Sequence, residues 1–449
     1  MNTEKGGHQL RPEDGKAVPF RRLSRLAGLG GMAASIAGGM AVNGAKQFAS
    51  GKRPSMTDLM MTPSNARKVT AQLSNMRGAA MKIGQMISMD SGDILPKEFA
   101  EILARLRSDA QHMPKAQLDN VLTEQWGEGW KARFKSFQYQ PIAAASIGQV
   151  QRATGLKGEA LAIKVQYPGV RESIDSDVNN VASLLKMTGL VPSGLDTAPL
   201  IEEGRRQLHQ EADYLREAAY LELFAKLLAG DDNFDVPVYF PELSTDRILT
   251  MSYIESLPIE ALLDAPQEAR DRVVSLLIEF LLRELFEFGA MQTDPNFANY
   301  RYNSRAQRLV LLDFGASREV GADMAASYKN IMRAALSGNT QASFDAAAHI
   351  GFISADMPQR FKTAILDIID TALEPLRVNA PFDFGNNALA ARMRDKALAL
   401  AGEKELWHLP PPETVFIQRK IGGMYMLATQ LRARVNVRAL MIKYVRQEG

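Results

Sequence analysis

Two acidic side chains and an amide near position 300 have the types and the spacing needed for phosphoryl transfer. Asn299 lies five residues after Asp294, and the apolar run 309–312 leads into Asp313-Phe314-Gly315. Carboxylate and amide oxygens are preferred Mg²⁺ ligands, and an aspartate beside them can accept the proton of an attacking hydroxyl. We therefore predict that Asp294 is the catalytic base and that Asn299 and Asp313 bind the metal ion.

Groups that hold the phosphates of ATP are expected upstream, on a strand and a helix. Lys164 lies within the apolar run 161–165, which is typical of a buried strand. The later segment 211–217 is predicted to be helical, and one of its acidic side chains can pair with Lys164 and orient it onto the α- and β-phosphates. We assign this ion pair to Glu217. A charged helix face exposed to solvent is the alternative.

A loop before this strand is the predicted phosphate cover. In protein kinases a glycine-rich loop stands here and its backbone N–H groups close over the phosphates. In this chain the loop is rich in alanine, and its predicted nucleotide-binding residues are Ala143, Ala144, Ala145 and Ser146. Because alanine disfavours positive φ, we expect a stiffer loop that holds the nucleotide in another pose. A plain turn is the alternative.

The adenine contacts are predicted at the end of a second strand, 247–253. Backbone groups of Ser252, Tyr253 and Ile254 would hydrogen-bond the base, with the side chain of Met251 behind it. The alternative is an ordinary strand end that leads into a linker.

The predicted catalytic loop lacks one cation. Two residues after Asp294, where many protein kinases carry a lysine, this chain has Asn296. A positive charge must then reach the transferring phosphoryl group from elsewhere, or transfer is slow. Lys82 and Gln85, three residues apart on one face of a predicted helix, are the candidate replacements. A solvated helix edge is the alternative for this pair.

The elements that must position these residues change in character along the chain. Helical periodicity dominates 57–140, and short strands at 160–166 and 247–253 enclose predicted helices 175–187 and 200–228. Beyond residue 258 the only strong strand is 309–313, and the rest is predicted helix: 266–288, 322–336, 342–349, 358–373, 389–401 and 413–431. We predict an α+β, bilobal, protein-kinase-like fold. Its parts are a polar and Gly/Ala-rich N-terminus (1–55), a helical extension (56–140), an N-lobe (141–256) and a mostly helical C-lobe (257–449).

Composition restricts the possible partners and compartments. The 449 residues carry a net charge of +2 and no cysteine, which gives no reason to expect nucleic acid and excludes disulfides and thiolate metal sites. The N-terminus has acidic residues and no secretory hydrophobic core, so we expect a bacterial, cytoplasmic protein peripheral to the inner membrane. The uncharged segment 26–45 has basic flanks. It has the length of a membrane span, but its many glycines favour a helix packed on protein or on a lipid surface.

Taken in order, these motifs resemble the UbiB/AarF family of atypical protein-kinase-like proteins, and most of all its coenzyme Q-biosynthesis branch. They are Lys82-x-Gly84-Gln85, the alanine-rich loop, Ala162-Ile163-Lys164, Glu211-x-Asp213, Gln292-Thr293-Asp294-Pro295-Asn296 with Asn299, and Asp313-Phe314-Gly315. The resemblance covers roughly residues 20–445. The stretch around Asp294 differs from the His-x-Asp-x-His-Pro-Gly-Asn pattern of the bacterial UbiB branch.

The resemblance implies properties that the residues alone do not. The N-terminal extension would fold over the place of a protein substrate, so that Lys82 and Gln85 point into the nucleotide pocket with Glu211 as the extension's partner. The implied activity is Mg-ATP binding and ATP hydrolysis in support of ubiquinone biosynthesis, with phosphorylation of other proteins doubtful. The implied partners are ATP, ubiquinone-biosynthesis enzymes or lipid-like quinone precursors, and the membrane surface.

Two departures from ordinary kinases keep other functions open. No Ala-Pro-Glu-like segment follows Asp313-Phe314-Gly315, so a peptide-docking activation segment is not expected. The alanine-rich loop and Asn296 are also compatible with a nucleotide-gated pseudokinase scaffold. The missing peptide-docking segment is equally compatible with a small-molecule phosphotransferase. Residues 413–445 mix apolar residues with several basic ones, Lys420 among them, which indicates a packed amphipathic region.

Overall fold

The computed structural model describes residues 76, 78–80, 82–83, 112–188, 198–386, 388–401 and 412–445. The chain forms two compact units. Unit 1 comprises residues 1–219 and 238–253, and unit 2 comprises residues 220–237 and 254–449. The sequence placed the boundary between N-lobe and C-lobe at 256/257. In the structure the chain passes finally into unit 2 after Tyr253, and the earlier segment 220–237 also belongs to unit 2.

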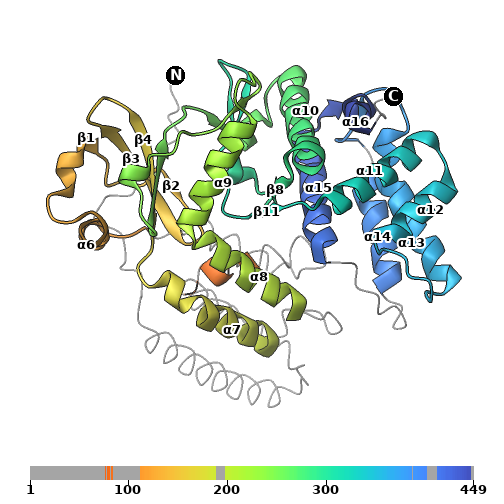
Figure 1. Ribbon diagram of the computed structural model, residues 1–449, viewed down its shortest axis with the longest axis horizontal. Coiled ribbons are helices and arrows are strands. Elements are labelled where there is room, and N and C mark those ends of the chain that lie inside the picture. Colours follow the sequence, from red (N-terminus) through yellow and green to blue (C-terminus); the bar gives the residue numbers. More distant parts are fainter. Residues whose placement is uncertain are drawn as a thin grey trace, which may run out of the picture. The chain divides into compact units, whose positions relative to one another are not determined.

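Unit 1 is built on an antiparallel five-stranded sheet (Figure 1). Its strands are β1 (Phe134–Phe137), β2 (Ala143–Ala144), β3 (Gly148–Gly155), β4 (Ala160–Gln166) and β6 (Ile248–Ser252). They lie in the order β1-β3-β4-β6, and β2 also pairs with β3. The predicted strands around Lys164 and Met251 are neighbours in this sheet, with Ala162 opposite Met251. The sheet therefore joins the predicted phosphate loop, the Lys164 strand and the predicted adenine strand.

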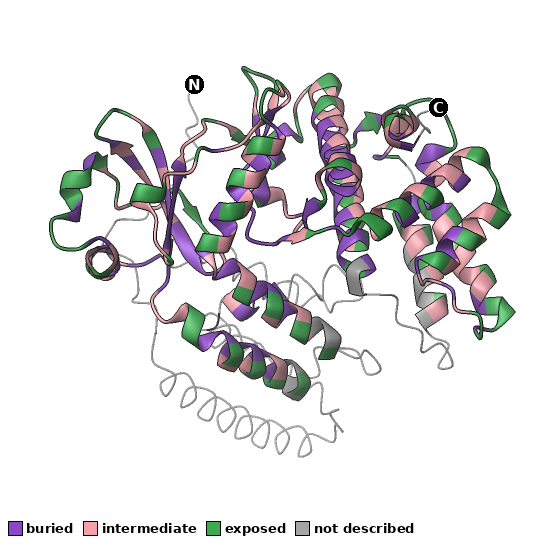
Figure 2. Cartoon of the chain, viewed as in Figure 1, coloured by how far each residue is buried: buried purple, intermediate pink, exposed green. Residues whose placement is uncertain are grey.

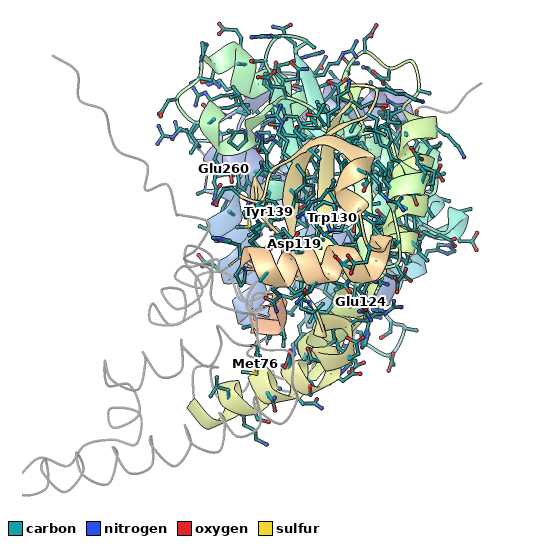
Figure 3. All side chains as sticks on the ribbon, turned by 90° about the vertical axis from the view of Figure 1, so that its left-hand side faces the viewer. Met76, Asp119, Glu124, Trp130, Tyr139 and Glu260 are labelled. Atoms are coloured by element: carbon teal, nitrogen blue, oxygen red, sulfur yellow. The ribbon has the colours of Figure 1, made fainter. Side chains whose placement is uncertain are left out.

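Helix α6 (Lys115–Trp126) supplies aromatic and aliphatic side chains to the core of unit 1. Trp126 packs on Phe134 and Trp130 with ring centroids 5.4 Å and 5.9 Å apart. Figure 3 labels Asp119 on this helix and Trp130 and Tyr139 near it, and the Tyr139 hydroxyl donates to Asp119 Oδ1 at 2.7 Å. The contacts fix α6 against the edge of the sheet that holds β1.

One predicted helical stretch in unit 1 ends earlier than expected. Within the stretch 57–140, for which helical periodicity was predicted, α6 stops at Trp126, because Gly127 adopts a φ of +83° that ends a helix. A short 3₁₀ turn (Trp130–Arg133) and strand β1 follow. The prediction of helix through residue 140 is wrong there.

The predicted helix over 200–228 is two helices, α8 (Ala198–Glu211) and α9 (Tyr214–Leu227), preceded by α7 (Val170–Thr188). Asp213 lies in the break and caps α9, since its carboxylate accepts the N–H of Arg216 at 3.0 Å. Glu211 and Glu217 therefore lie on different helices, not on one continuous helix as predicted.

Unit 2 is mostly helical, as expected. Its helices are α10 (Gln267–Arg283), α11 (Ala322–Ser337), α12 (Thr340–His349), α13 (Gln359–Ala372), α14 (Leu389–Ala401), α15 (Pro412–Gln430) and α16 (Val437–Val445). Their ends lie within two residues of most predicted boundaries. Helix α10 continues into a π-helix, Glu284–Phe288, which ends at Gly289 with φ +62°. Figure 2 shows that α10 is largely buried, in agreement with its run of buried apolar residues.

Unit 2 contains more strands than the sequence predicted. Besides β10 (Arg308–Leu311), the predicted one, it has β5 (Phe234–Asp235), β7 (Leu257–Pro258), β8 (Ala290–Gln292), β9 (Tyr300–Asn303), β11 (Ser317–Glu319), β12 (Phe382–Asp383) and β13 (Arg434–Val435). They form one four-stranded sheet, β5-β10-β9-β7, and the pairs β8–β11 and β12–β13. Strands of two to four residues are too short to show an alternating pattern.

Among the described residues, no helix combines the length and the apolar character needed to cross a membrane. The uncharged segment 26–45 lies outside the described residues.

Candidate active site

Lys164 and Glu217 form a buried ion pair in unit 1. The Lys164 ammonium donates to both carboxylate oxygens of Glu217 at 2.8 Å, and only 7% of Lys164 and 1% of Glu217 is exposed. The ammonium also lies 5.1 Å from the ring centre of Tyr214. A symmetrical contact with both oxygens holds the lysine in one direction, which is what a phosphate-orienting lysine requires.

A second buried lysine, Lys82, connects the N-terminal extension to the alanine-rich loop. Its ammonium lies 2.5 Å from Glu211 Oε1, while the Ser146 hydroxyl donates to Glu211 Oε2, also at 2.5 Å. Close backbone packing supports the connection, because a Cβ on Gly78 would lie 3.1 Å from Ser146 O. One carboxylate thus joins Lys82 of the extension to Ser146 of the loop. The other predicted residue of this motif, Gln85, lies outside the described residues.

The alanine-rich loop is a short hairpin. Ala143 and Ala144 form β2 and pair with Val150 and Gln149, and Ala145 donates its N–H to Gly148 O at 2.9 Å. Apart from glycines, positive φ occurs within the described residues only at Gln307 and Arg432, so the loop alanines keep ordinary backbone angles. Gly148 is required for close packing, since a Cβ there would lie 2.4 Å from Val165 O.

The predicted adenine-binding stretch already uses some of its backbone donors. Ser252 N–H donates to Val238 O and Tyr253 N–H donates to Ala160 O, both at 2.8 Å. Met251 is buried in β6, as expected for a side chain behind the base. The N–H groups of Ser252 and Tyr253 are therefore not available for the predicted adenine contacts, which stay a prediction.

In unit 2 the predicted catalytic loop is held by hydrogen bonds to one carbonyl. The side-chain amides of Gln292 and Asn299 both donate to Asp294 O, at 2.8 Å and 2.9 Å. Leu312 N–H donates to Asn299 O at 3.1 Å. These bonds attach the segment that carries Asp294 and Asn299 to the end of the strand that precedes Asp313.

The Asp313-Phe314-Gly315 segment has its own anchors. Asp313 Oδ1 accepts the N–H of Gly315 at 3.0 Å, and the buried Phe314 ring stacks on Phe224 of α9 with centroids 4.9 Å apart. The Thr293 hydroxyl donates to Ala316 O at 2.6 Å. The structure thus brings Asp294, Asn299 and Asp313, which are separated in sequence, into one hydrogen-bonded part of unit 2.

Asn296, which stands at the position of the missing lysine, has a structural part in this loop. Its Oδ1 accepts the N–H of Ala298 at 3.1 Å and caps the 3₁₀ turn Phe297–Asn299. After Gly315 the chain runs through β11, which pairs with β8, directly into α11. This short connection agrees with the expected lack of a peptide-docking segment.

The donor atoms on the loop suit a Mg²⁺ ion that is completed by phosphate oxygens. The Asn299 amide is oriented by its donation to Asp294 O, which leaves its side-chain oxygen as the candidate ligand atom. Asp313 supplies a carboxylate, and oxygen ligands of these two kinds are what Mg²⁺ prefers. The described residues contain no group of three or more His, Cys, Asp or Glu residues that could hold a metal ion.

Sequence reasoning missed an ion pair between Glu284 and Lys420, both of which are fully buried. Lys420 was predicted only to be one of several basic residues in an amphipathic region. A signal was present, because Phe416, Ile417, Met424 and Leu427 are buried at helical spacing and Lys420 lies in the same stripe. A lysine inside the apolar stripe of a helix needs a partner.

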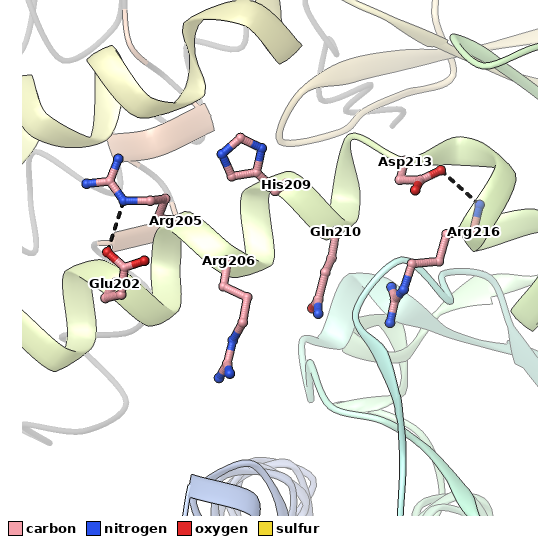
Figure 4. Close-up of a pocket in the computed structure, with 7 residues that line it drawn as sticks. All are labelled: Glu202, Arg205, Arg206, His209, Gln210, Asp213 and Arg216. Atoms are coloured by element: carbon pink, nitrogen blue, oxygen red, sulfur yellow. Dashed lines mark hydrogen bonds and ion pairs between the residues drawn. The ribbon is translucent and has the colours of Figure 1, made fainter.

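A surface hollow of about 410 Å³ lies along α8 and the start of α9 (Figure 4). It is lined by Glu202, Arg205, Arg206, His209, Gln210, Asp213 and Arg216. Its charges pair locally: Arg205 contacts Asp175 and Glu202, at 3.0 Å and 3.1 Å. The hydrogen bonds from His209 and Arg205 lower the pKa of Asp175.

Comparisons with known proteins extend over most of the chain. A family model described as the ABC1 atypical kinase-like domain matches residues 105–346. The mitochondrial atypical kinase COQ8 of Saccharomyces cerevisiae is 38% identical over 422 residues, which cover 94% of this chain and 84% of that protein. The mitochondrial atypical kinase COQ8B of Rattus norvegicus is 35% identical over 427 residues, with coverage of 95% and 80%.

A solved structure supports the fold independently. Rv3197 from Mycobacterium tuberculosis, in its complex with erythromycin, is 25% identical to this chain with a TM-score of 0.58. The match covers 85% of this chain and 96% of the solved one. The kinase-like α+β fold predicted from the sequence is confirmed.

Proposed function

Because this chain belongs to the ABC1/UbiB family of atypical kinases, as its motifs predicted, we propose that it is an ATP-dependent atypical kinase or ATPase that supports coenzyme Q biosynthesis. The observation that carries the chemistry is the buried pair of Lys164 and Glu217 in unit 1, together with the hydrogen-bonded Asp294, Asn299 and Asp313 segments in unit 2. These are the residue types that cradle phosphates, hold Mg²⁺ and accept a proton in phosphoryl transfer.

Each group has a distinct proposed role. Lys164, held by Glu217, binds phosphate oxygens of ATP, and the alanine-rich loop covers them. Asn299 and Asp313 hold Mg²⁺, which neutralises the negative charge that develops on the phosphates. Asp294 orients the attacking hydroxyl or water and accepts its proton. With Asn296 in place of a lysine, we expect slow turnover.

The acceptor and the place of action are proposed on other grounds. The similarity of this chain to the atypical kinase COQ8 supports lipid-like quinone precursors, or the enzymes that handle them, as partners. The uncharged segment 26–45 with its basic flanks supports peripheral contact with an anionic membrane surface. We do not expect nucleic acid as a partner, because the net charge is only +2.

The direct test is ATP hydrolysis by the purified full-length protein with Mg²⁺, with and without anionic liposomes. We expect turnover that rises with liposomes and is lost in Asp313→Asn. Equal Mg-ATP affinity and equal turnover in wild type and Asp313→Asn would contradict the proposal.

A nucleotide-gated scaffold is the second candidate, favoured by Asn296 acting as a turn cap and by the paired β2–β3 hairpin in the phosphate loop. It predicts that the wild type binds ATP but hydrolyses none. Coenzyme Q production in cells would then be lost only in variants that no longer bind nucleotide, such as Lys164→Met, and kept in Asp294→Asn.

A further inference from the structure

Helix α15 places a charged side chain in the interior of unit 2. Lys420 and Glu284 are both 0% exposed, and the Lys420 ammonium lies 2.9 Å from Glu284 Oε2. This contact is an ion pair and does not have the geometry of a hydrogen bond. Rings of Phe280 and Tyr300 lie 5.2 Å and 5.5 Å from the ammonium. A methionine would fill such a position without the cost of burying a charge, so the charge needs a further explanation.

The hydrogen bonds of this pair lead to the loop that carries Asp294. The Lys420 ammonium donates to Gln292 O at 2.7 Å and to the Tyr300 hydroxyl at 2.9 Å. Glu284 Oε1 accepts the backbone N–H of Gln292 at 2.7 Å. The ammonium also donates to Gln292 Oε1 at 3.3 Å, so its three N–H groups are directed to Gln292 and Tyr300 while Glu284 supplies the opposite charge.

Gln292 and Tyr300 flank the predicted catalytic residues. Gln292 comes two residues before Asp294 and Tyr300 directly follows Asn299. The Gln292 side chain in turn donates to Asp294 O at 2.8 Å and accepts from the Tyr300 hydroxyl at 3.1 Å. Lys420 therefore restrains both ends of the segment 292–300. The Gln292 side chain connects this restraint to the backbone carbonyl of Asp294.

A second contact of α15 reaches the same segment. Gly423, one turn after Lys420, packs so closely on Pro295 that a Cβ would lie 2.1 Å from Pro295 Cγ. The helix thus supports the loop at Gln292, at Pro295 and at Tyr300. Glu284 itself begins the π-helix Glu284–Phe288, an irregular element that often marks functional sites.

We infer that Lys420, paired with Glu284, is a positioning residue that holds Asp294 in place for phosphoryl transfer. The inference rests on the proposed role of Asp294. Lys420 acts through its hydrogen bonds to Gln292 and Tyr300. Because a displacement of about 1 Å at a reacting group can lower a rate by about 10²-fold, loss of this support should reduce turnover strongly.

The experiment compares Lys420→Met with Lys443→Met, which removes an exposed lysine on α16. The wild type and Asp294→Asn serve as references for activity. For Lys420→Met we expect kcat for Mg-ATP hydrolysis to fall by at least about 10-fold while KM changes by less than about 3-fold. For Lys443→Met we expect wild-type values. In hydrogen exchange we expect the amide of Gln292 to lose protection in Lys420→Met, while the β-sheet amides of unit 1 keep theirs.

Lys420→Met leaves Glu284 buried without its partner and could therefore unfold the protein, so a second variant is needed. Glu284→Gln with Lys420→Met removes both charges and keeps an amide oxygen for Gln292 N–H, yet lacks the donors to Gln292 O and Tyr300. A folded variant with wild-type kcat and wild-type protection of Gln292 overturns the inference. Lack of ATP hydrolysis in the wild type refutes the proposed function instead, and the exchange experiment then decides on Lys420 alone.

Discussion

Two adjacent glycines in α15 provide a direct test of how closely this helix packs on the catalytic loop. A Cβ on Gly423 would lie 2.1 Å from Cγ and 2.3 Å from Cβ of Pro295, whereas a Cβ on Gly422 would meet nothing within 4 Å. Carbon atoms normally approach to about 3.5–4.0 Å, so Gly423→Ala must displace the helix or the loop by more than about 1 Å. The proline ring is closed onto its own backbone nitrogen, so its Cβ and Cγ cannot rotate aside.

Both substitutions gain helix propensity, but only Gly423→Ala also introduces a steric clash. Replacing glycine by alanine inside a helix stabilises by about 0.5–1 kcal/mol in both variants. Gly423→Ala adds an overpacking cost of about 1–3 kcal/mol. The helix term cancels in the comparison, so Gly423→Ala should be less stable than Gly422→Ala by about 1–3 kcal/mol.

The assay is urea unfolding followed by helical circular dichroism, together with ATP hydrolysis. We expect Gly422→Ala to match or exceed the wild-type urea midpoint and to keep wild-type kcat. For Gly423→Ala we expect a lower midpoint and a kcat reduced by about 10- to 100-fold, because Pro295 directly follows Asp294. Equal midpoints and equal rates in the two variants would refute the close packing of α15 against Pro295.

Three further predictions concern other contacts of the site. Glu217→Gln should destabilise the protein by about 3–5 kcal/mol in urea unfolding, because it leaves the Lys164 charge buried without its partner. The double variant Lys164→Met with Glu217→Leu should regain most of that stability but bind no Mg-ATP in calorimetry. A stable double variant that still binds ATP would argue against the role assigned to this ion pair. Burial raises the pKa of Glu284 to about 7 despite Lys420, so folded protein holds a proton that unfolded protein releases above about pH 4.5. The unfolding free energy of wild type relative to Glu284→Gln should therefore fall by up to about 3 kcal/mol between pH 4.5 and 7.5, and a rise over this range would contradict the shift. Ala144→Gly should loosen the β2–β3 hairpin and increase autophosphorylation measured with labelled ATP, whereas unchanged incorporation would show that loop stiffness does not limit transfer.

The parts of the site that could be predicted from sequence are those with local spacing. Asp294, Asn299 and Asp313 lie within twenty residues, and the metal and phosphate chemistry dictates their types. Helix α14 (Leu389–Ala401) was predicted with its observed ends, since a helical pattern is also local. The break between α8 and α9 was missed because Glu211-Ala212-Asp213 looks like ordinary helix until Asp213 is seen to cap the next one.

Contacts between distant segments could not be predicted in the same way. Lys420 and Glu284 are 136 residues apart, and nothing in either local sequence names the other. Lys164 and Glu217 are also distant, but the pattern of a strand lysine and a helix glutamate in phosphotransferases supplied the link. Strands such as β8 and β11 exist only because their partner is brought close by the fold, so their sequences carry little pattern.

The buried charges of the described residues show where this fold concentrates electrostatic restraint. Three lysines are buried there, Lys82, Lys164 and Lys420, and each contacts a buried glutamate: Glu211, Glu217 and Glu284. Each pair is attached to a segment of the predicted site, namely the alanine-rich loop, the phosphate-binding strand and the Asp294 loop. Because a buried ion pair contributes little net stability, stability alone does not explain three of them at these places.

The buried lysines also concern the positive charge that Asn296, in place of a lysine, does not provide. Lys420 donates to Gln292 and Tyr300 and forms an ion pair with Glu284, and Lys82 forms an ion pair with Glu211. Because both lysines are engaged by buried glutamates, neither is an obvious substitute for the cation, and we expect slow turnover.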